Sequence, residues 1–89
     1  MEFRWNDWNF DKVEQHGVDP LEAEGVVEAC APPYPSYRGD GRYLVWGRGR
    51  GGRLLQVVFV IDDDGTLFTI HARPLTESEK RRYRRTRRR

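Results

Sequence analysis

The stretch RLLQVVFVID, residues 53–62, most constrains how this chain can fold, because it is apolar almost without interruption. A short apolar run bounded by turn-forming residues is typical of a central β-strand that is buried on both faces. GRGG precedes the run and DDDG follows it, and each composition predicts a tight turn. The sequence therefore predicts a strand that is entered and left through hairpins.

Two further strands flank this central one, RYLVWGR at 42–48 and TLFTIHAR at 66–73. Side chains alternate between the two faces of a strand. In the last strand this alternation predicts two sets: Phe68, Ile70 and Ala72 toward the helices, and Leu67, Thr69, His71 and Arg73 toward the opposite face. Pro74 then ends the pairing. A His–Arg pair is thus expected on the uncovered face at a strand end.

Three helices are indicated by their capping residues and by one apolar stripe. Asn6 is a suitable N-cap for a short helix that ends before Gly17. Asp19 and Pro20 open a second helix, whose apolar stripe is Ala23, Val26, Val27 and Cys30 and whose opposite face carries Glu22, Glu24 and Glu28. Thr76 and Glu79 form a capping box at the start of the third helix. That helix grades into KRRYRRTRRR, of which eight of ten residues are basic.

The expected architecture is a two-layer α+β domain. A short edge strand at EFRW gives the order β-α-α-β-β-β-α, with an antiparallel sheet of three to four strands and helices mainly on one face. The 89 residues suffice for a single core. We expect one domain over residues 1–83, followed by a flexible basic tail over 84–89. The second sheet face should be open at least in part.

Charge is distributed unevenly along the chain, although the net value is only +2. Residues 1–37 carry two basic and eight acidic side chains, net −6, whereas residues 38–89 carry fourteen and six, net +8. Arg outnumbers Lys fourteen to two, and guanidinium groups suit phosphate and stacking on bases. A nucleic acid is therefore a natural partner. The expected phosphate contacts are Arg81, Arg82, Arg84 and Arg85; the alternatives are a solubility tail or an arm that binds an acidic protein.

Six side chains could carry out metal-free cleavage of RNA: Lys12, His16, Arg42, Arg53, His71 and Arg73. This reaction needs a base for the 2′-hydroxyl proton, an acid for the leaving 5′-oxygen, and cations for the phosphate. Histidine suits the first two roles and arginine the third. Other interpretations remain open. His16 could cap helix carbonyls, His71 and Arg73 could be solvated on an open sheet face, and the hairpin geometry does not require Arg42 and Arg53 to meet.

Several classes of site lack their sequence signals. GRGRGG has no following Lys-Ser or Lys-Thr, as a phosphate loop requires, and DDDG lacks the ligand spacing of a calcium loop. No nucleophile elbow, clustered metal ligands or cofactor motif is present, and Cys30, the single cysteine, reads as an inert thiol in an apolar stripe. No stretch has the length and apolar character of a membrane helix or signal peptide, so a cytoplasmic protein is expected.

Three groups of residues carry a family resemblance: FRW…DK…QHGV…EA, GRYLVWG…GRLLQVVFV and IHARPLTESEKRRY. Together they resemble the BrnT-like ribonuclease toxins of type II toxin–antitoxin modules, over nearly the whole chain and in the same order. The resemblance implies a RelE-like α+β fold. It also implies metal-independent RNA cleavage, without a cofactor, that suppresses translation and growth.

The resemblance further implies partners and site residues. A cognate antitoxin would neutralise the chain, operator DNA would be bound only through the antitoxin complex, and a homodimer or a dimer of heterodimers is plausible. The functional residues would be Lys12 and His16, either Arg42 or Arg53, and Arg73. Two other functions stay open, a non-catalytic nucleic-acid-binding module and a protein-interaction module, both using the cationic face and the Arg-rich end.

Overall fold

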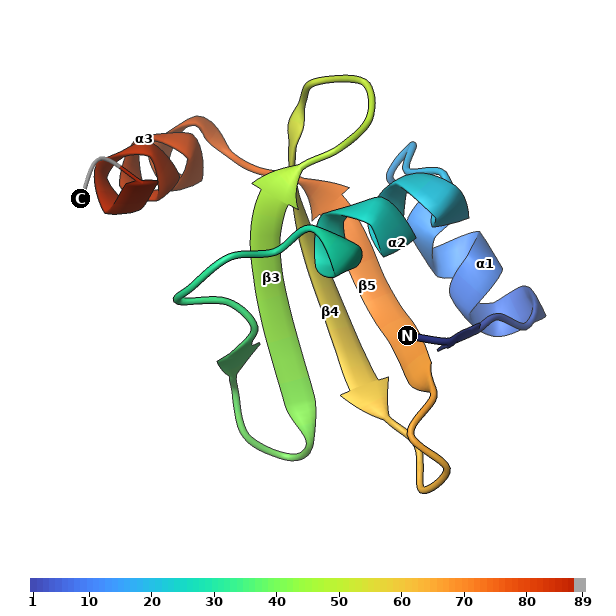
Figure 1. Cartoon of the computed structure of the whole chain (residues 1–89). Coiled ribbons are helices and arrows are strands. Elements are labelled where there is room, and N and C mark those ends of the chain that lie inside the picture. Colours follow the sequence, from blue (N-terminus) through green and yellow to red (C-terminus); the bar gives the residue numbers. More distant parts are fainter. Residues whose placement is uncertain (88–89) are drawn as a thin grey trace.

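The computed structural model describes residues 1–87 and shows an α+β fold of one sheet and three helices (Figure 1). In chain order the elements are β1 (Phe3–Arg4), α1 (Asp7–Glu14), α2 (Pro20–Glu28), β2 (Ser36–Tyr37), β3 (Arg42–Arg48), β4 (Leu54–Ile61), β5 (Leu67–Pro74) and α3 (Glu77–Arg87). The predicted fold class is confirmed. The order differs from the predicted one only by the additional short strand β2.

The sheet has five strands in the order β1-β5-β4-β3-β2. The antiparallel meander β3–β4–β5 forms its centre, as the apolar run and its two turns predicted. β2 adds antiparallel to one edge, and β1 adds parallel to β5 at the other. The expected count of three to four strands was low because both outer strands are only two residues long.

One face of the sheet is covered by α2, which lies in front of the strands in Figure 1. Val45 of β3 and Leu55 and Val57 of β4 are fully buried beneath it. A Cβ on Gly47 would lie 3.2 Å from Cγ1 of Val26, so the glycine permits α2 to approach β3 closely. α1 lies along β5, and its Val13 joins the same core.

A bulge in β5 changes which side chains point into the core. Val58 pairs with His71 whereas Phe59 pairs with Thr69, so Ile70 is an extra residue in the ladder. The strict alternation predicted from the sequence is therefore wrong for the first half of the strand: Leu67 and Thr69 are buried and Phe68 is half-exposed. It is right for the second half, where Ala72 is buried and both His71 and Arg73 lie on the opposite face.

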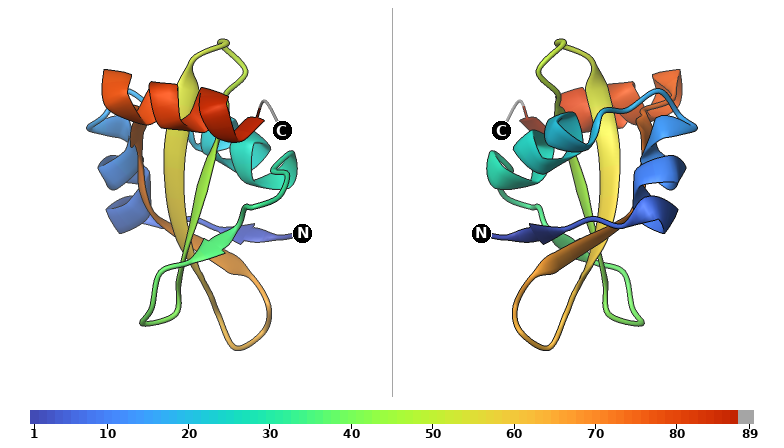
Figure 2. Two further views of the ribbon diagram at one scale, coloured as in Figure 1. Left: turned by 90° about the vertical axis from the view of Figure 1, so that its left-hand side faces the viewer. Right: turned by 90° about the vertical axis from the view of Figure 1, so that its right-hand side faces the viewer.

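The predicted helix starts are confirmed. The Asn6 side chain accepts from the Asn9 backbone N–H, and the Asn6 backbone N–H donates to Oδ1 of Asn9 in return. The Asp19 side chain accepts from the Leu21 N–H. The edge-on views of Figure 2 show α3 running across the end of the sheet near the β3–β4 loop. α3 continues to Arg87, so much of the predicted flexible tail over 84–89 is helical; residues 88–89 lie outside the described residues.

Candidate functional site

The sheet face opposite α2 carries the candidate site. The strand register arranges its side chains in three rows across β3, β4 and β5: Trp46–Gln56–Arg73, Leu44–Val58–His71 and Arg42–Val60–Phe68. All are half-buried except Arg42, which is exposed. This face is therefore a shallow, largely apolar surface that presents one histidine and one arginine side by side on β5.

The structure brings the two histidines of the chain together. His71 lies on β5, and His16 lies in the turn that follows α1, with ring centroids 5.7 Å apart in an edge-to-face arrangement. The turn is closed by the His16 N–H, which donates to the Val13 carbonyl, and by Gly17, whose φ of 73° lies in the left-handed region. α1 and β5 thus place both imidazoles at the same point of the face, although they are far apart in the sequence.

The surroundings of His71 favour its neutral form. Burial lowers its pKa below the ordinary value, and the nearby charges of Arg73, His16 and Lys12 lower it further, while Glu79 opposes them. The buried Nε2 of His71 has no hydrogen-bond partner among residues 1–87. The lowered pKa thus favours a neutral His71 ring at neutral pH.

Arg73 forms a bidentate ion pair with Glu79 of α3. Nη1 and Nη2 lie 2.8 Å from the two carboxylate oxygens, and Nη1 also donates to the Pro74 carbonyl at 3.0 Å. Hydrogen bonds from Arg73 lower the pKa of Glu79 to about 2, and the Thr76 backbone N–H, which donates to Glu79, adds to this effect. The arginine therefore attaches α3 to the end of β5 as well as contributing charge beside His71.

A hydrogen-bonded chain extends from this ion pair across the sheet. The Oε1 atom of Gln56 accepts from Nη2 of Arg73 at 3.4 Å and from Nε1 of Trp46 at 3.0 Å. The Arg82 guanidinium of α3 lies 5.3 Å from the centre of the Trp46 ring, within cation–π range. The Trp46–Gln56–Arg73 row thus contacts α3 at both ends, through Arg82 at Trp46 and through Glu79 at Arg73.

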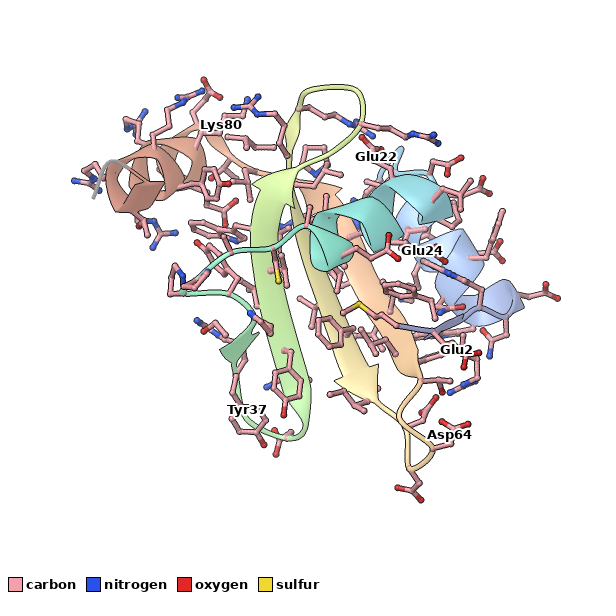
Figure 3. The ribbon with its side chains drawn as sticks, in the orientation of Figure 1. Glu2, Glu22, Glu24, Tyr37, Asp64 and Lys80 are labelled. Atoms are coloured by element: carbon pink, nitrogen blue, oxygen red, sulfur yellow. The ribbon has the colours of Figure 1, made fainter. Side chains whose placement is uncertain are left out.

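Arg53 lies apart from the histidines' face and holds the turn that carries His16. Its guanidinium donates to the Gly17 carbonyl and to Glu22, with Nη2 3.0 Å from Oε1. Figure 3 shows Glu22 at the start of α2, beside the β3–β4 loop. Glu22 was predicted only to lie opposite the apolar stripe of its helix; in the structure its side chain is 7% exposed and is neutralised by Arg53.

Arg42 is also separate from the histidines. It donates to the Gly39 carbonyl at 3.2 Å and lies 3.7 Å from the Asp40 carboxylate, at the opposite end of β3 from Arg48. Four residues of strand, about 13 Å, separate it from Trp46 in the row that contains Arg73. Nζ of Lys12 lies 5.4 Å from the centre of the Trp8 ring, and its charge helps to lower the pKa of His71. Of the six predicted residues, the structure therefore brings together His16, His71 and Arg73, with Lys12 nearby, and leaves Arg42 and Arg53 outside this cluster.

The predicted phosphate contacts all lie on α3, whose exposed residues include Arg81, Arg82, Arg84 and Arg85. The acidic residues of that helix are already paired, Glu77 with Lys80 and Glu79 with Arg73. The sequence interpretation missed Glu79 and Gln56 as neighbours of Arg73. The capping box identified Glu79 only as a helix start, and Gln56 could be placed only once the strand register was known.

Comparisons with known proteins are consistent with this architecture. No family model matches the sequence, and no curated protein matches it significantly. The structure is similar to the crystal structure of the Brucella abortus ribonuclease toxin BrnT, with a TM-score of 0.68 and 16% sequence identity. The similarity covers 86% of this chain and 99% of that one. At this identity the likeness establishes a BrnT-like fold. No helix within residues 1–87 is long and apolar enough to cross a membrane.

Proposed function

We propose that this protein is the toxin of a toxin–antitoxin module and acts as a metal-independent endoribonuclease. The observation that carries the proposal is the His16–His71 pair, 5.7 Å apart, on the sheet face beside Arg73. The BrnT-like fold supports it, since the protein with that fold in the comparison is a ribonuclease toxin. Cleavage of RNA would suppress translation and growth.

We infer a role for each histidine. His71 is the base, because its lowered pKa keeps the ring neutral, and it removes the proton of the RNA 2′-hydroxyl. The 2′-oxygen then attacks the adjacent phosphorus, and the bond to the 5′-oxygen breaks. His16 protonates that leaving oxygen, so the products are a 2′,3′-cyclic phosphate and a 5′-hydroxyl. Lys12 and Arg73 stabilise the charge that develops on the phosphate.

The proposal extends to the partners of the chain. A cognate antitoxin would cover the toxin, and operator DNA would be bound only by the resulting complex, in which two heterodimers could associate. The chain would act in the cytoplasm on RNA, and the four arginines of α3 would add contacts to phosphate.

Cleavage of a labelled RNA, with and without a chelator, tests this proposal. We expect cleavage under both conditions, loss of at least two orders of magnitude in rate for His71→Asn and His16→Asn, and little change for Arg42→Gln, a matched change of a site candidate outside the cluster. Intact RNA under both conditions would rule out the enzyme. Cleavage that stops on adding chelator would rule out the metal-independent route.

A second function, non-catalytic binding of nucleic acid, is favoured by one specific observation. Glu79 engages both Nη atoms of Arg73, so this cation is already neutralised in the structure. A binding module needs only the basic surface of α3 and no reactive histidines. RNA binding that survives both histidine substitutions, with no product at any pH, would establish this alternative.

A further inference from the structure

A pocket of about 520 Å³ lies beside the edge of β3, between the end of α2 and the helix α3. β2 pairs only with Tyr43 and Leu44 of β3, so within residues 1–87 the rest of that strand has no neighbour on the pocket side. The side chains that line the pocket include Cys30, Tyr34, Trp46, Arg48, Tyr83 and Arg84. The folded chain thus brings three separate segments around one cavity.

Aromatic rings form one wall of this pocket. The Tyr34 ring lies 6.3 Å from Trp46 at an interplanar angle of 35°, and 6.3 Å from Tyr83 at 28°. The three residues come from the loop after α2, from β3 and from α3, and together they give the cavity aromatic surfaces. Such surfaces stack with unpaired nucleobases of any type, because every base has a π-face.

The charged side chains at the pocket are positive and favour an anionic ligand. Arg48 and Arg84 belong to its lining, and none of the lining residues within 1–87 is acidic. Nη1 of Arg48 also donates to the Gly52 carbonyl of the β3–β4 loop. Arg82 adds a guanidinium 5.3 Å from the Trp46 ring. A base in the cavity would therefore have cations available for the phosphates on either side of it. Aromatic rings combined with arginines distinguish this cavity from an apolar groove that binds a peptide side chain.

Hydrogen bonds connect the pocket wall to the histidine site. Trp46 contributes to the pocket wall, and through Gln56 it is hydrogen-bonded to Arg73, the neighbour of His71 on the same face. Trp46 and Arg73 are two strands apart, about 10 Å, which a short single strand spans. An RNA chain that crosses β5, β4 and β3 would pass from the histidines to the cavity.

We propose that this pocket is a nucleobase subsite for single-stranded RNA. One unpaired base stacks on the wall formed by Tyr34 and Trp46, and Arg48 and Arg84 contact the adjacent phosphates. The choice of RNA rests on the proposed cleavage function. The subsite goes beyond it by requiring an unpaired nucleotide a short distance from the scissile bond.

The first test uses the unaltered chain, because Cys30 is its only cysteine and lines the pocket. The probe is a short 2′-O-methyl oligoribonucleotide, which lacks the hydroxyl needed for cleavage. We expect the bound probe to slow alkylation of Cys30 severalfold. A series of probes, each with one abasic nucleotide at a different position, should all bind. Only the probe that lacks the base at the subsite should fail to protect Cys30. A bound probe that leaves the alkylation rate unchanged would overturn the subsite.

The second test uses affinity. Tyr34→Ala should weaken probe binding roughly tenfold, and Tyr34→Phe should retain wild-type affinity because the ring remains. Tyr37→Ala is the matched control, since this tyrosine is 58% exposed and lies outside the pocket. Equal losses for Tyr34→Ala and Tyr37→Ala would overturn the subsite. If Tyr34→Ala does not fold, the Cys30 protection measured on the unaltered chain decides the question.

The two proposals fail in different ways. Protection of Cys30 that depends on one base, in a chain that cleaves no RNA, would support the subsite and refute the ribonuclease. The opposite outcome is a chain that cleaves RNA, whose Cys30 alkylation rate is unchanged by the bound probe and whose affinity for the probe is unchanged by Tyr34→Ala. This outcome would refute the subsite and leave the ribonuclease proposal intact.

Discussion

Replacing Glu79 by Gln isolates the charge of the Arg73–Glu79 pair, the main ionic link between β5 and α3. Glutamine is nearly isosteric and also serves at the third helical position of a capping box, so the bond to the Thr76 N–H is retained. What is lost is the negative charge facing Arg73. A change in stability therefore reports the ion pair rather than the helix start.

The structure sets the size of this loss. The pKa of Glu79 falls from 4.5 to about 2, and each unit corresponds to roughly 1.4 kcal/mol, so the upper limit is about 3 kcal/mol. The two side chains are 27% and 13% exposed, and this partial solvation reduces the value. We expect Glu79→Gln to lower the free energy of unfolding by about 2 kcal/mol.

The same pKa shift fixes the pH range of the effect. Because the folded-state pKa lies below the unfolded one, the pair stabilises the fold fully above about pH 4.5, and its contribution is lost as the pH falls toward 2. The wild-type chain should therefore lose more stability over this range than the variant does.

Urea denaturation followed by tryptophan fluorescence, repeated from neutral to acidic pH, measures both effects. Glu77→Gln is the matched control, because it removes a carboxylate two positions away whose side chain is 78% exposed and forms an ion pair with Lys80. Equal free energies of unfolding for Glu79→Gln and Glu77→Gln at neutral pH would refute the assigned role of the pair. So would identical pH dependence of wild type and variant.

Three further predictions concern the pH profile, a glycine contact and the basic helix. If His71 is the base, kcat/KM should decline at acidic pH with an apparent pKa below 6.5, because burial and neighbouring cations lower the pKa of His71. An apparent pKa above 6.5 for this decline would exclude the assignment. Gly49→Ala should destabilise the fold by about 1–3 kcal/mol in thermal or urea unfolding, because its Cβ would lie 2.5 Å from the Glu22 carboxylate. Gly25→Ala is the control: its Cβ would have nothing within 4 Å, and alanine should stabilise α2. Arg85→Gln should reduce the slope of log affinity for single-stranded RNA against log salt concentration by about 0.7, and an unchanged slope would show that this side chain contacts no phosphate.

The fold was largely predictable because its signals are local. The apolar run at 54–61 and its two turns define the meander, and Asn6, Asp19 and Thr76 define the helix starts through side chains within three residues. The bulge in β5 was not predictable, since strict alternation also fits that strand. It arises from packing, which buries Thr69 and leaves Phe68 stacked on Trp8 at a centroid distance of 6.0 Å.

The site was predictable only in part, because its members meet through register and packing. The spacing of His71 and Arg73 placed both on one face, and that part of the prediction is confirmed. No local sequence pattern predicts that His16 lies beside His71. Nor does any local pattern predict that Arg53 pairs with the buried Glu22 and not with a phosphate. Charged residues at strand ends look alike in the sequence until their partners are known.

The observed ion pair of Arg73 and its proposed contact with phosphate compete for the same atoms, and the Glu79→Gln variant also separates these two roles. In the structure both Nη atoms of Arg73 contact the Glu79 carboxylate. A phosphate oxygen could therefore bind these Nη atoms only by displacing the carboxylate. If Arg73 contacts the scissile phosphate during cleavage, removing the competing charge should raise kcat/KM for RNA even as the fold becomes less stable. If Arg73 only fixes α3 beside the histidines, kcat/KM should fall or stay unchanged. Opposite changes in stability and activity would show that the ion pair stabilises the fold at the expense of phosphate binding.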